Sequence, residues 1–403
     1  MQHEIIIIGS GHAGAMAAIF LRQLKFSGSI TIIGEESSLP YQRPSLSKAF
    51  LEGKDTLERL YLRSAEFYKK NNINLIQNQY VKEIIKDSRE VVLQNHKKLE
   101  YSKLIIATGS SVNKIKSNYN DNKLHYLRTI EDSIKLRDCL NKDTTLGIIG
   151  SGYIGLEIAA IAIKKEVSVT IIESESRLMS RVISPELSHF FQNLHENKGV
   201  KFHLNSSAIG FKNNNTNMSI ELNNKSEVCA NNIAIGIGVS PNVQLAIDAG
   251  INCNNGIIVD ENCITSDPNV YAIGDCSNHF NKILGMNLRL ESVQNAVSQA
   301  KTIANFIVGS QKPYNEVPWF WSEQYDIKLQ IAGISEIYDE EILRGSIEDK
   351  KFSLFYLKNE KLISVAAINS PKDFNIGKKL ITSQINLSKS IIENTSTDLK
   401  KYI

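Results

Sequence analysis

Two segments of the chain show the same succession of hydrophobic and polar positions. Each begins with a short apolar run, IIII at 5–8 and LGII at 146–149, and continues through three glycines into a longer apolar stretch. Each ends in another short run, ITII at 30–33 and VTII at 169–172. Short runs rich in β-branched residues are typical of strands buried on both faces of a parallel sheet, and the longer stretches favour helices. The pattern therefore predicts two β-α-β units.

Further strands are expected in KLII at 103–106 and NVYAI at 269–273, and a helix within LRLESVQNAVSQAKTIANFI at 288–307. Each of these two strands runs into a turn of small residues, so their carboxyl ends are expected at one edge of a sheet, where ligands of open α/β sheets bind. Asparagine-rich segments at 213–217 and 223–224 are interpreted as hairpin turns.

Beyond Pro313 the pattern changes to that of alternating strands. KLQIAG at 328–333 is expected to be a strand, and KFSLFYL at 351–357 with LISVAAI at 362–368 is expected to form a hairpin, followed by helices from about 372. This part of the chain therefore predicts a separate α+β domain.

Both predicted strand-to-helix turns carry glycines in the spacing G-x-G-x-x-G, as GSGHAG at 9–14 and GSGYIG at 150–155. The first glycine permits a tight turn, the second lets the backbone approach a pyrophosphate, and the third lets the helix pack on the strand. The helix N-terminus then presents N–H groups to the phosphates. Glu35 and Glu173 end the second strand of each unit and are expected to accept hydrogen bonds from an adenosine ribose. Two complete copies predict two dinucleotide sites.

Two dinucleotide sites in one chain indicate a resident FAD in the first and a nicotinamide, which delivers a hydride, in the second. Glu173 would favour NADH, since its carboxylate would repel the additional phosphate of NADPH; Arg177 and Arg181 nearby would weaken that preference. Asp275 is expected to bind a ribityl hydroxyl of FAD, the alternative being an aspartate that only caps its loop. N–H groups of the following helix would stabilise negative charge on the reduced flavin.

These placements predict an α/β fold with two Rossmann-like dinucleotide-binding domains of the glutathione-reductase type and a C-terminal α+β domain. The expected boundaries are 1–108 with 231–310 for a discontinuous FAD-binding domain, 109–230 for the NADH-binding domain, and 311–403 for the C-terminal interface domain.

Composition disfavours several functional classes. The 46 Lys and Arg residues nearly balance 43 Asp and Glu, and a net charge of +3 argues against nucleic-acid binding by bulk electrostatics. The five cysteines are scattered without a C-x-x-C pair, so neither a disulfide framework nor a metal site is expected. No apolar run approaches the ~20 residues of a membrane span, and no secretory signal is visible. We expect a cytoplasmic protein that does not bind membranes.

The chain resembles the FAD-dependent, NADH-dependent ferredoxin reductases of bacterial oxygenase systems, a family that includes putidaredoxin reductase and the reductase of biphenyl dioxygenase. Besides both glycine motifs, the resemblance rests on LPYQRPSLSK (39–48), RLMSR (177–181), GIGVSPN (236–242) and PWFWSEQYDIKLQIAG (318–333). It implies that NADH delivers a hydride to non-covalently bound FAD. Single electrons then pass to a [2Fe-2S] ferredoxin, which supplies a P450 or Rieske-type terminal oxygenase. A monomer or weak dimer is expected.

The resemblance also implies roles for individual residues. Lys48 would lie near the reactive nitrogen of the flavin, paired with Glu157, where a cation favours the electron-rich reduced form. Trp321 would stack by the flavin and face the ferredoxin, with Trp319 close behind. The alternatives are a solvated Lys48 and a tryptophan that only packs.

Other residues are expected to contact the two dinucleotides. Arg43 and Arg128 would bind the pyrophosphate and adenine side of FAD. Tyr153 would lie near the nicotinamide path, where packing alone is the alternative, and Glu291 would bind the carboxamide. The expected FAD contacts are Gly9, Gly11, His12, Ala13, Gly14, Glu35, Arg43, Lys48, Val81, Ala107, Arg128, Asp275, Val293 and Trp321. The expected NADH contacts are Gly150, Gly152, Tyr153, Ile154, Gly155, Glu173, Gly238 and Glu291.

Three alternatives stay open. A rubredoxin reductase or a flavin NADH oxidase would use the same two sites with a different electron acceptor. A redox-sensing interaction protein of the apoptosis-inducing-factor type would need a long regulatory insertion or a targeting segment, and the sequence shows neither.

The first cysteine is Cys139, and serines stand at 37 and 38 before the LPY segment, which disfavours the thiol mechanism of disulfide reductases.

Overall fold

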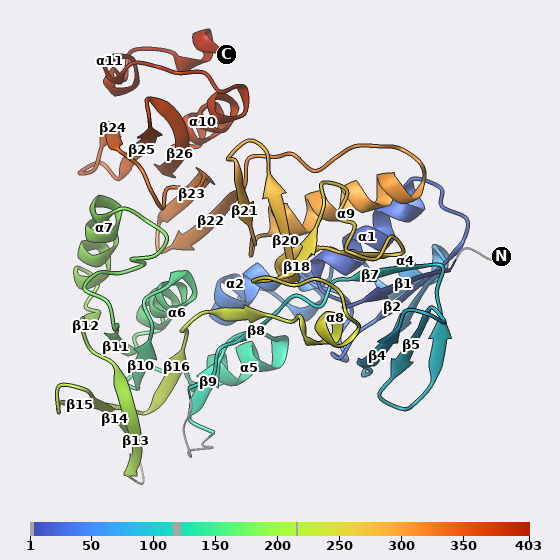
Figure 1. Cartoon of the computed structure of the whole chain (residues 1–403). Coiled ribbons are helices and arrows are strands. Elements are labelled where there is room, and N and C mark those ends of the chain that lie inside the picture. Colours follow the sequence, from blue (N-terminus) through green and yellow to red (C-terminus); the bar gives the residue numbers. More distant parts are fainter. Residues whose placement is uncertain (1–3, 116–121, 215–216) are drawn as a thin grey trace. The chain divides into compact units, whose positions relative to one another are not determined.

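The computed structural model describes residues 4–115, 122–214 and 217–403. Its chain forms two compact units (Figure 1). The first unit comprises the described parts of Met1–Gln42, Leu57–Ser111 and Ser240–Phe320. The second unit comprises the described parts of Arg43–Thr56, Val112–Val239 and Trp321–Ile403.

A five-stranded parallel sheet forms the centre of the first unit, with strand order β19-β7-β1-β2-β3. Ile5 and Ile7 of β1 pack on one face with helices α1 and α9, which lie side by side, whereas Ile6 and Ile8 belong to a second core on the other face. Both faces are therefore covered, which explains why the strands are continuously apolar. The elements are β1 Glu4–Ile8, α1 His12–Gln23, β2 Ser29–Ile33, β3 Ile73–Ile76, β7 Lys103–Ile106, β19 Val270–Ala272 and α9 Val293–Ile307.

Smaller elements complete this unit. An antiparallel sheet, β4 to β6, contributes Val81, Val91 and Leu93 to the second core, and a sheet of order β18-β20-β21 precedes α9. Their bounds are β4 Val81–Ile85, β5 Glu90–Leu93, β6 Lys98–Glu100, β18 Ile257–Val259, β20 Ser277–Asn281 and β21 Met286–Leu288. The short helices are α3 Leu57–Leu60, α4 Ala65–Lys70, α8 Gln244–Asp248 and η2 Gly274–Cys276. Two short strands, β8 Ser110–Val112 and β17 Val239–Pro241, pair where the chain passes from one unit to the other.

The second unit contains its own parallel sheet, with strand order β12-β11-β10-β16-β9. An antiparallel sheet, β13 to β15, packs Met218 and Ile220 against Ile149 and Ile233. The elements are β9 Leu124–Tyr126, α5 Ile130–Cys139, β10 Thr145–Ile149, α6 Tyr153–Lys164, β11 Ser168–Ile172, α7 Pro185–Glu196, β12 Lys201–His203, β13 Ala208–Asn214, β14 Asn217–Leu222, β15 Glu227–Ala230 and β16 Asn232–Ile235. The turn expected at 223–224 joins β14 to β15, and the turn expected at 213–217 lies partly outside the described residues.

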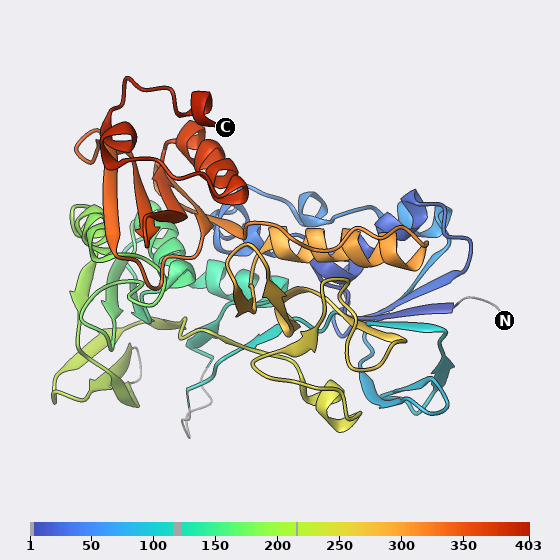
Figure 2. The same ribbon diagram turned by 45° about the horizontal axis from the view of Figure 1, so that its top comes forward.

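The C-terminal part of this unit is an antiparallel sheet of order β22-β23-β26-β25-β24, with α10 packed on β23 and β26 (Figure 2). The hairpin expected from the sequence is confirmed as β25 and β26, in which Phe355 pairs with Val365. The elements are β22 Trp319–Gln324, β23 Ile327–Gly333, β24 Glu340–Ser346, β25 Lys351–Lys358, β26 Lys361–Ile368, α10 Pro371–Ser383, α11 Lys389–Glu393 and η3 Leu399–Tyr402. The predicted fold class, two parallel α/β sheets and a C-terminal α+β part, is confirmed.

The two compact units differ from the three predicted domains in several places. Residues 231–239 belong to the second unit and residues 311–320 to the first, and the rest of the C-terminal part belongs to the second unit. The largest internal difference lies between β2 and α3. Residues Arg43–Thr56, expected within the FAD-binding domain, belong to the second unit, where they form η1 Arg43–Ser47 and α2 Ala49–Glu52. Tertiary contacts account for this assignment, because the Ser133 hydroxyl of α5 donates to the Leu46 carbonyl at 2.8 Å. Sequence neighbours of this segment alone could not indicate such a contact.

Two buried histidines are expected to make the fold sensitive to acid. Burial lowers the pKa of His195 to about 4, although its hydrogen bond with Gln324 opposes the shift, and burial lowers the pKa of His279 to about 4. The unfolded chain binds protons below about pH 6.5 that the folded chain does not, so the free energy of unfolding should fall as the pH decreases from 6.5 to 4. The loss should reach roughly 3 kcal/mol per histidine.

Urea unfolding at pH 7, 5.5 and 4.5 measures this loss. Because carboxylates also titrate in this range, the informative quantity is the difference between wild type and His195→Gln, whose side chain does not titrate. We expect a weaker pH dependence in the variant. An identical pH dependence in both proteins would contradict the prediction.

Candidate active site

The first glycine turn leaves open space at the N-terminus of α1. Gly9 has φ +112°, and a Cβ there would lie 2.1 Å from the Ala107 carbonyl oxygen; a Cβ on Gly14 would lie 2.1 Å from the Gly9 carbonyl oxygen. A Cβ on Gly11 would meet nothing within 4 Å, and no side chain caps α1. Gly9 and Gly14 therefore serve the close packing of the turn, whereas Gly11 leaves room for a phosphate beside the helix N-terminus.

The second turn has the same geometry. Gly150 has φ +97°, and a Cβ there would lie 2.4 Å from the Gly236 carbonyl oxygen, while a Cβ on Gly155 would lie 2.3 Å from that of Gly150. Gly152 again faces open space, at the uncapped start of α6. Both turns therefore fit a dinucleotide pyrophosphate, and each does so within one unit.

The two acidic residues are not equivalent in position. Ile8 pairs with Ile33 and Ile149 pairs with Ile172, so the counterpart of Glu173 in the first copy is Gly34, and Glu35 lies one residue further along. A Cβ on Gly34 would lie 2.1 Å from the hydroxyl oxygen and 2.6 Å from the Cβ of Ser10, so Ser10 would have to shift before a side chain could stand there. Glu35 is exposed, and its contact with an FAD ribose stays a prediction.

Glu173 is held in the second turn by four hydrogen bonds. Its Oε2 accepts from the Ser151 backbone N–H at 2.8 Å and from the Ser151 hydroxyl at 2.5 Å, and its Oε1 accepts from the Glu175 N–H at 3.0 Å and the Ser174 hydroxyl at 3.2 Å. Burial by itself would raise the pKa of Glu173, but these hydrogen bonds outweigh burial and lower it below its usual value. The residue is thus a fixed negative charge beside the turn.

The carboxyl edge of the sheet in the first unit brings several expected FAD residues together. Asp275 in η2 follows β19 and accepts from the Ser110 hydroxyl at 2.9 Å, while the preceding Gly274 N–H donates to Gln299 of α9 at 2.7 Å. Burial lowers the pKa of His12, the first residue of α1, and the Asp275 carboxylate partly opposes this shift. Ala107 follows β7 at the same edge. The residues present therefore fit one end of a dinucleotide site.

Three other expected contacts of this unit lie in different surroundings. The Val81 side chain is buried in the second core, so only its backbone is available to a ligand. Glu291, expected to bind the nicotinamide carboxamide, is 42% exposed and forms an ion pair with Arg289 at 2.6 Å. Val293 is the first residue of α9, directly after its N-cap Ser292.

One buried carboxylate of the second unit accepts hydrogen bonds from three side chains. Glu157 of α6 is 2% exposed, and its Oε2 accepts from Lys48 Nζ at 2.6 Å and from the Ser47 hydroxyl at 2.5 Å. Its Oε1 accepts from the Ser322 hydroxyl of β22 at 2.6 Å. The sequence analysis paired Lys48 with Glu157, and the structure contains this ion pair. Ser47 and Ser322 were not expected, since no sequence pattern marks a serine that donates to a buried carboxylate.

Further expected residues belong to the same unit. Tyr153 lies one turn before Glu157 on α6; burial raises the pKa of its phenol, and the Glu157 carboxylate raises it further, so the phenol keeps its proton. The Arg43 guanidinium donates to the Arg128 carbonyl at 2.7 Å. Ile154 is 42% exposed, and Gly238 has φ +95°.

The expected FAD contacts are divided between the two units. Arg43, Lys48, Arg128 and Trp321 belong to the second unit, and the other expected FAD contacts belong to the first. The two tryptophans fall on either side of the boundary, Trp319 in the first unit and Trp321 in the second. Glu291, expected to bind NADH, belongs to the first unit.

Family comparison supports the same interpretation of both turns. Residues 3–300 match the pyridine nucleotide-disulphide oxidoreductase family, and residues 319–403 match the reductase C-terminal domain. The chain belongs to this oxidoreductase family. The resemblance found from the sequence motifs is therefore confirmed.

Several members of the family are similar over nearly the full length. Putidaredoxin reductase of Pseudomonas putida is 36% identical over 99% of this chain and 96% of its own. The 5,5'-dehydrodivanillate O-demethylase ferredoxin reductase subunit of a Sphingobium species is 36% identical, over 100% and 98%. A rubredoxin-NAD(+) reductase of Pseudomonas putida is 35% identical, over 91% and 96%. The crystal structure of a covalent putidaredoxin reductase–putidaredoxin complex has a TM-score of 0.96, with 36% identity and coverage of 99% and 98%.

The family's name refers to disulphides, but the cysteines of this member form none. All five are free. Cys263 and Cys276 are buried, and burial raises the pKa of both thiols, which disfavours the reactive thiolate. Among the described residues, no group of three or more His, Cys, Asp or Glu side chains could hold a metal ion. No helix in the described ranges is long and apolar enough to cross a membrane.

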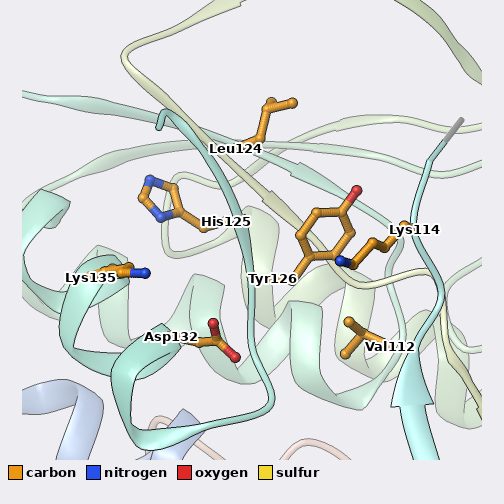
Figure 3. A pocket seen from close by; sticks show the side chains of 7 residues that line it. All are labelled: Val112, Lys114, Leu124, His125, Tyr126, Asp132 and Lys135. Atoms are coloured by element: carbon orange, nitrogen blue, oxygen red, sulfur yellow. The ribbon is translucent and has the colours of Figure 1, made fainter. Parts of the chain in front are cut away.

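A pocket of about 280 Å³ lies in the second unit, and none of the residues that line it is an expected dinucleotide contact (Figure 3). Two of its polar side chains have structural partners: Asp132 accepts from the Thr129 N–H at 2.8 Å, and His125 is hydrogen-bonded to Asn232 at 3.1 Å. It is lined by Val112, Lys114, Leu124, His125, Tyr126, Asp132 and Lys135. The pocket therefore adds nothing to the candidate site.

The contribution of Glu173 to a preference for NADH over NADPH is expected to stay constant between pH 8 and about pH 5. The lowered pKa keeps Glu173 ionised over this range, and its charge should be lost only as the pH falls through that value. The ratio of kcat/KM values for the two nucleotides, measured at pH 8, 7, 6 and 5, tests this. A preference for NADH that disappears between pH 7 and 6 would show that its pH dependence comes from another group, such as the additional phosphate of NADPH, whose second pKa is about 6.

Proposed function

We propose that this protein oxidises NADH with bound FAD and reduces a [2Fe-2S] ferredoxin that supplies a P450 or Rieske-type oxygenase. Two complete dinucleotide turns, one in each unit, and the pairing of Lys48 with the buried carboxylate of Glu157 in the second unit carry the proposal. The relative named a ferredoxin reductase subunit, and the complex of putidaredoxin reductase with putidaredoxin, support this acceptor. Oxidation of one NADH would reduce two ferredoxin molecules, each by one electron, and release one proton.

The residues of this chain would bind and orient the two dinucleotides. Backbone N–H groups at the start of α1 would hold the FAD pyrophosphate, and Asp275 would accept from a ribityl hydroxyl. FAD would supply the hydride acceptor and pass electrons on singly. The start of α6 would hold the NADH pyrophosphate, and Glu173 would accept from its adenosine ribose.

Lys48 would supply the positive charge that favours the reduced flavin, while Glu157 holds its ammonium in place. Trp321 would pack by the flavin on the side of the ferredoxin. The protonated Tyr153 would cover the nicotinamide path. Because the reaction consumes NADH, we infer a cytoplasmic location.

The deciding experiment follows electrons to the acceptor. Purified protein should release FAD on denaturation, lose its flavin absorbance on anaerobic addition of NADH, and reduce cytochrome c only when a [2Fe-2S] ferredoxin is added. Protein without flavin, or without ferredoxin-dependent turnover, would refute the proposal. The similarity to a rubredoxin-NAD(+) reductase makes rubredoxin the second candidate acceptor. Faster turnover with rubredoxin than with a ferredoxin encoded beside the gene of this protein would favour it.

A further inference from the structure

A continuous series of side-chain hydrogen bonds ends on Glu157, all within the second unit. The Tyr325 hydroxyl lies 3.0 Å from Nδ1 of His195, and Nε2 of His195 lies 2.8 Å from Oε1 of Gln324. Nε2 of Gln324 donates to the Ser322 hydroxyl at 3.2 Å, and that hydroxyl donates to Oε1 of Glu157 at 2.6 Å. The series therefore connects α7 to the lysine-carboxylate pair through β22.

The donors of this series all point toward Glu157. Oε1 of Gln324 can only accept, so Nε2 of His195 carries the hydrogen and Nδ1 accepts from Tyr325. His195, Ser322, Gln324 and Glu157 are each at most 2% exposed. Hydrogen bonds aligned in a buried network polarise one another, and they leave few alternative orientations for the hydroxyl and amide groups that form them. The Ser322 hydroxyl is thereby directed at one carboxylate oxygen.

The two oxygens of Glu157 have different partners. Oε1 faces Ser322, while Oε2 faces both Lys48 and Ser47. Because Glu157 is buried, loss of the donor to Oε1 would leave a buried acceptor unpaired, and the carboxylate would turn to share the donors on Oε2. The direction of the Lys48 ammonium depends on that orientation.

We propose that Ser322, locked by Gln324 and His195, is a positioning residue that orients Glu157 and, through it, Lys48. The proposal rests on the proposed function, since its effect appears on the flavin. Successive residues of a strand point to opposite faces, so β22 carries Ser322 on one face and the expected ferredoxin-facing Trp321 on the other. The strand thus couples the C-terminal domain to the redox centre.

A double-mutant cycle on Ser322 and Lys48 tests the proposal. Ser322→Ala should slow NADH-driven flavin reduction about tenfold, the effect of one hydrogen bond to a charged group. It should also shift the flavin midpoint potential, measured by dye equilibration, in the direction seen for Lys48→Met. Because both residues act through one ammonium group, adding Ser322→Ala to Lys48→Met should produce no further shift.

Three further variants separate positioning from general damage. Ser322→Thr keeps a hydroxyl and should restore most of the rate. Ser364→Ala removes a buried hydroxyl of the same domain that donates to the Ala332 carbonyl at 2.9 Å, and should leave the potential unchanged. Gln324→Met removes the donor to Ser322 and should give a smaller shift of the same sign. It also serves as the test if Ser322→Ala does not fold.

Additive effects in the double variant, or a wild-type potential in Ser322→Ala, would overturn the positioning role while leaving the proposed function intact. Failure of the wild-type protein to bind FAD or to reduce it with NADH would overturn both. Reduction of FAD by NADH without transfer to ferredoxin would overturn only the proposed acceptor, because the midpoint potential needs no acceptor protein.

Discussion

Replacing Lys48 with methionine is expected to slow the reduction of bound FAD by NADH about a hundredfold, the usual cost of removing one group that stabilises charge developing in a reaction. The Lys48 side chain is 18% exposed and its ammonium lies 2.6 Å from Glu157, so the charge is held in place and only partly screened. Methionine keeps the length of the side chain and removes the charge. Stopped-flow absorbance under anaerobic conditions measures the rate constant.

Removing Lys48 also leaves Glu157 buried without its cation, which should lower the free energy of unfolding by about 3 kcal/mol. Glu157→Gln in the same background removes the unpaired charge and should recover part of this stability without recovering the rate. Lys54→Met is the matched control: Lys54 lies in the same segment, is 69% exposed and pairs with Glu52. We expect wild-type kinetics from it. Equal rates for Lys48→Met and wild type would remove Lys48 from the mechanism.

The second large effect is expected from Glu173→Arg, which should change the kcat/KM ratio of NADH to NADPH about a hundredfold in favour of NADPH. The carboxylate that would accept from the ribose is lost, and a cation replaces an anion beside the additional phosphate. At about 4 Å and an intermediate dielectric, such a charge reversal is equivalent to roughly 3 kcal/mol after allowance for partial exposure. Steady-state kinetics with both nucleotides measure the ratio.

Glu175→Arg controls for the change in net charge. Glu175 stands two residues further along and is exposed, and only its backbone N–H takes part in holding Glu173. A Glu175→Arg protein should keep the preference for NADH within about threefold, since an exposed charge is strongly screened. A shift as large as that of Glu173→Arg would mean that long-range charge, rather than the carboxylate in the turn, selects the nucleotide.

Local patterns were sufficient for most of the fold. The runs at 5–8 and 146–149 predicted the central strands because a strand covered on both faces has no polar positions. The glycine turns were equally predictable, since each glycine answers a requirement of a backbone only a few residues away. The segment 43–56 was expected in the FAD-binding domain but belongs to the second unit. Local patterns could not indicate this, because its partners, such as Ser133, are distant in sequence.

The candidate site shows the same division. Motif spacing was enough to nominate Glu35 and Glu173 together, but pairing between strands separates them: Glu173 takes the position of Gly34, where a side chain would meet Ser10. Strand register depends on which residues of two distant segments pair, and the spacing of residues within one motif does not determine this pairing.

By itself, the sequence determined two dinucleotide turns and two parallel sheets, because these follow from local backbone geometry and hydrophobic periodicity. Only the tertiary structure decided that Ser47 and Ser322 share Glu157 with Lys48, and that His195 and Gln324 extend this network. Ser47 and Ser322 are each more than a hundred residues from Glu157 in the sequence. A hydroxyl group can pair with a buried carboxylate only where folding brings the two within hydrogen-bond distance.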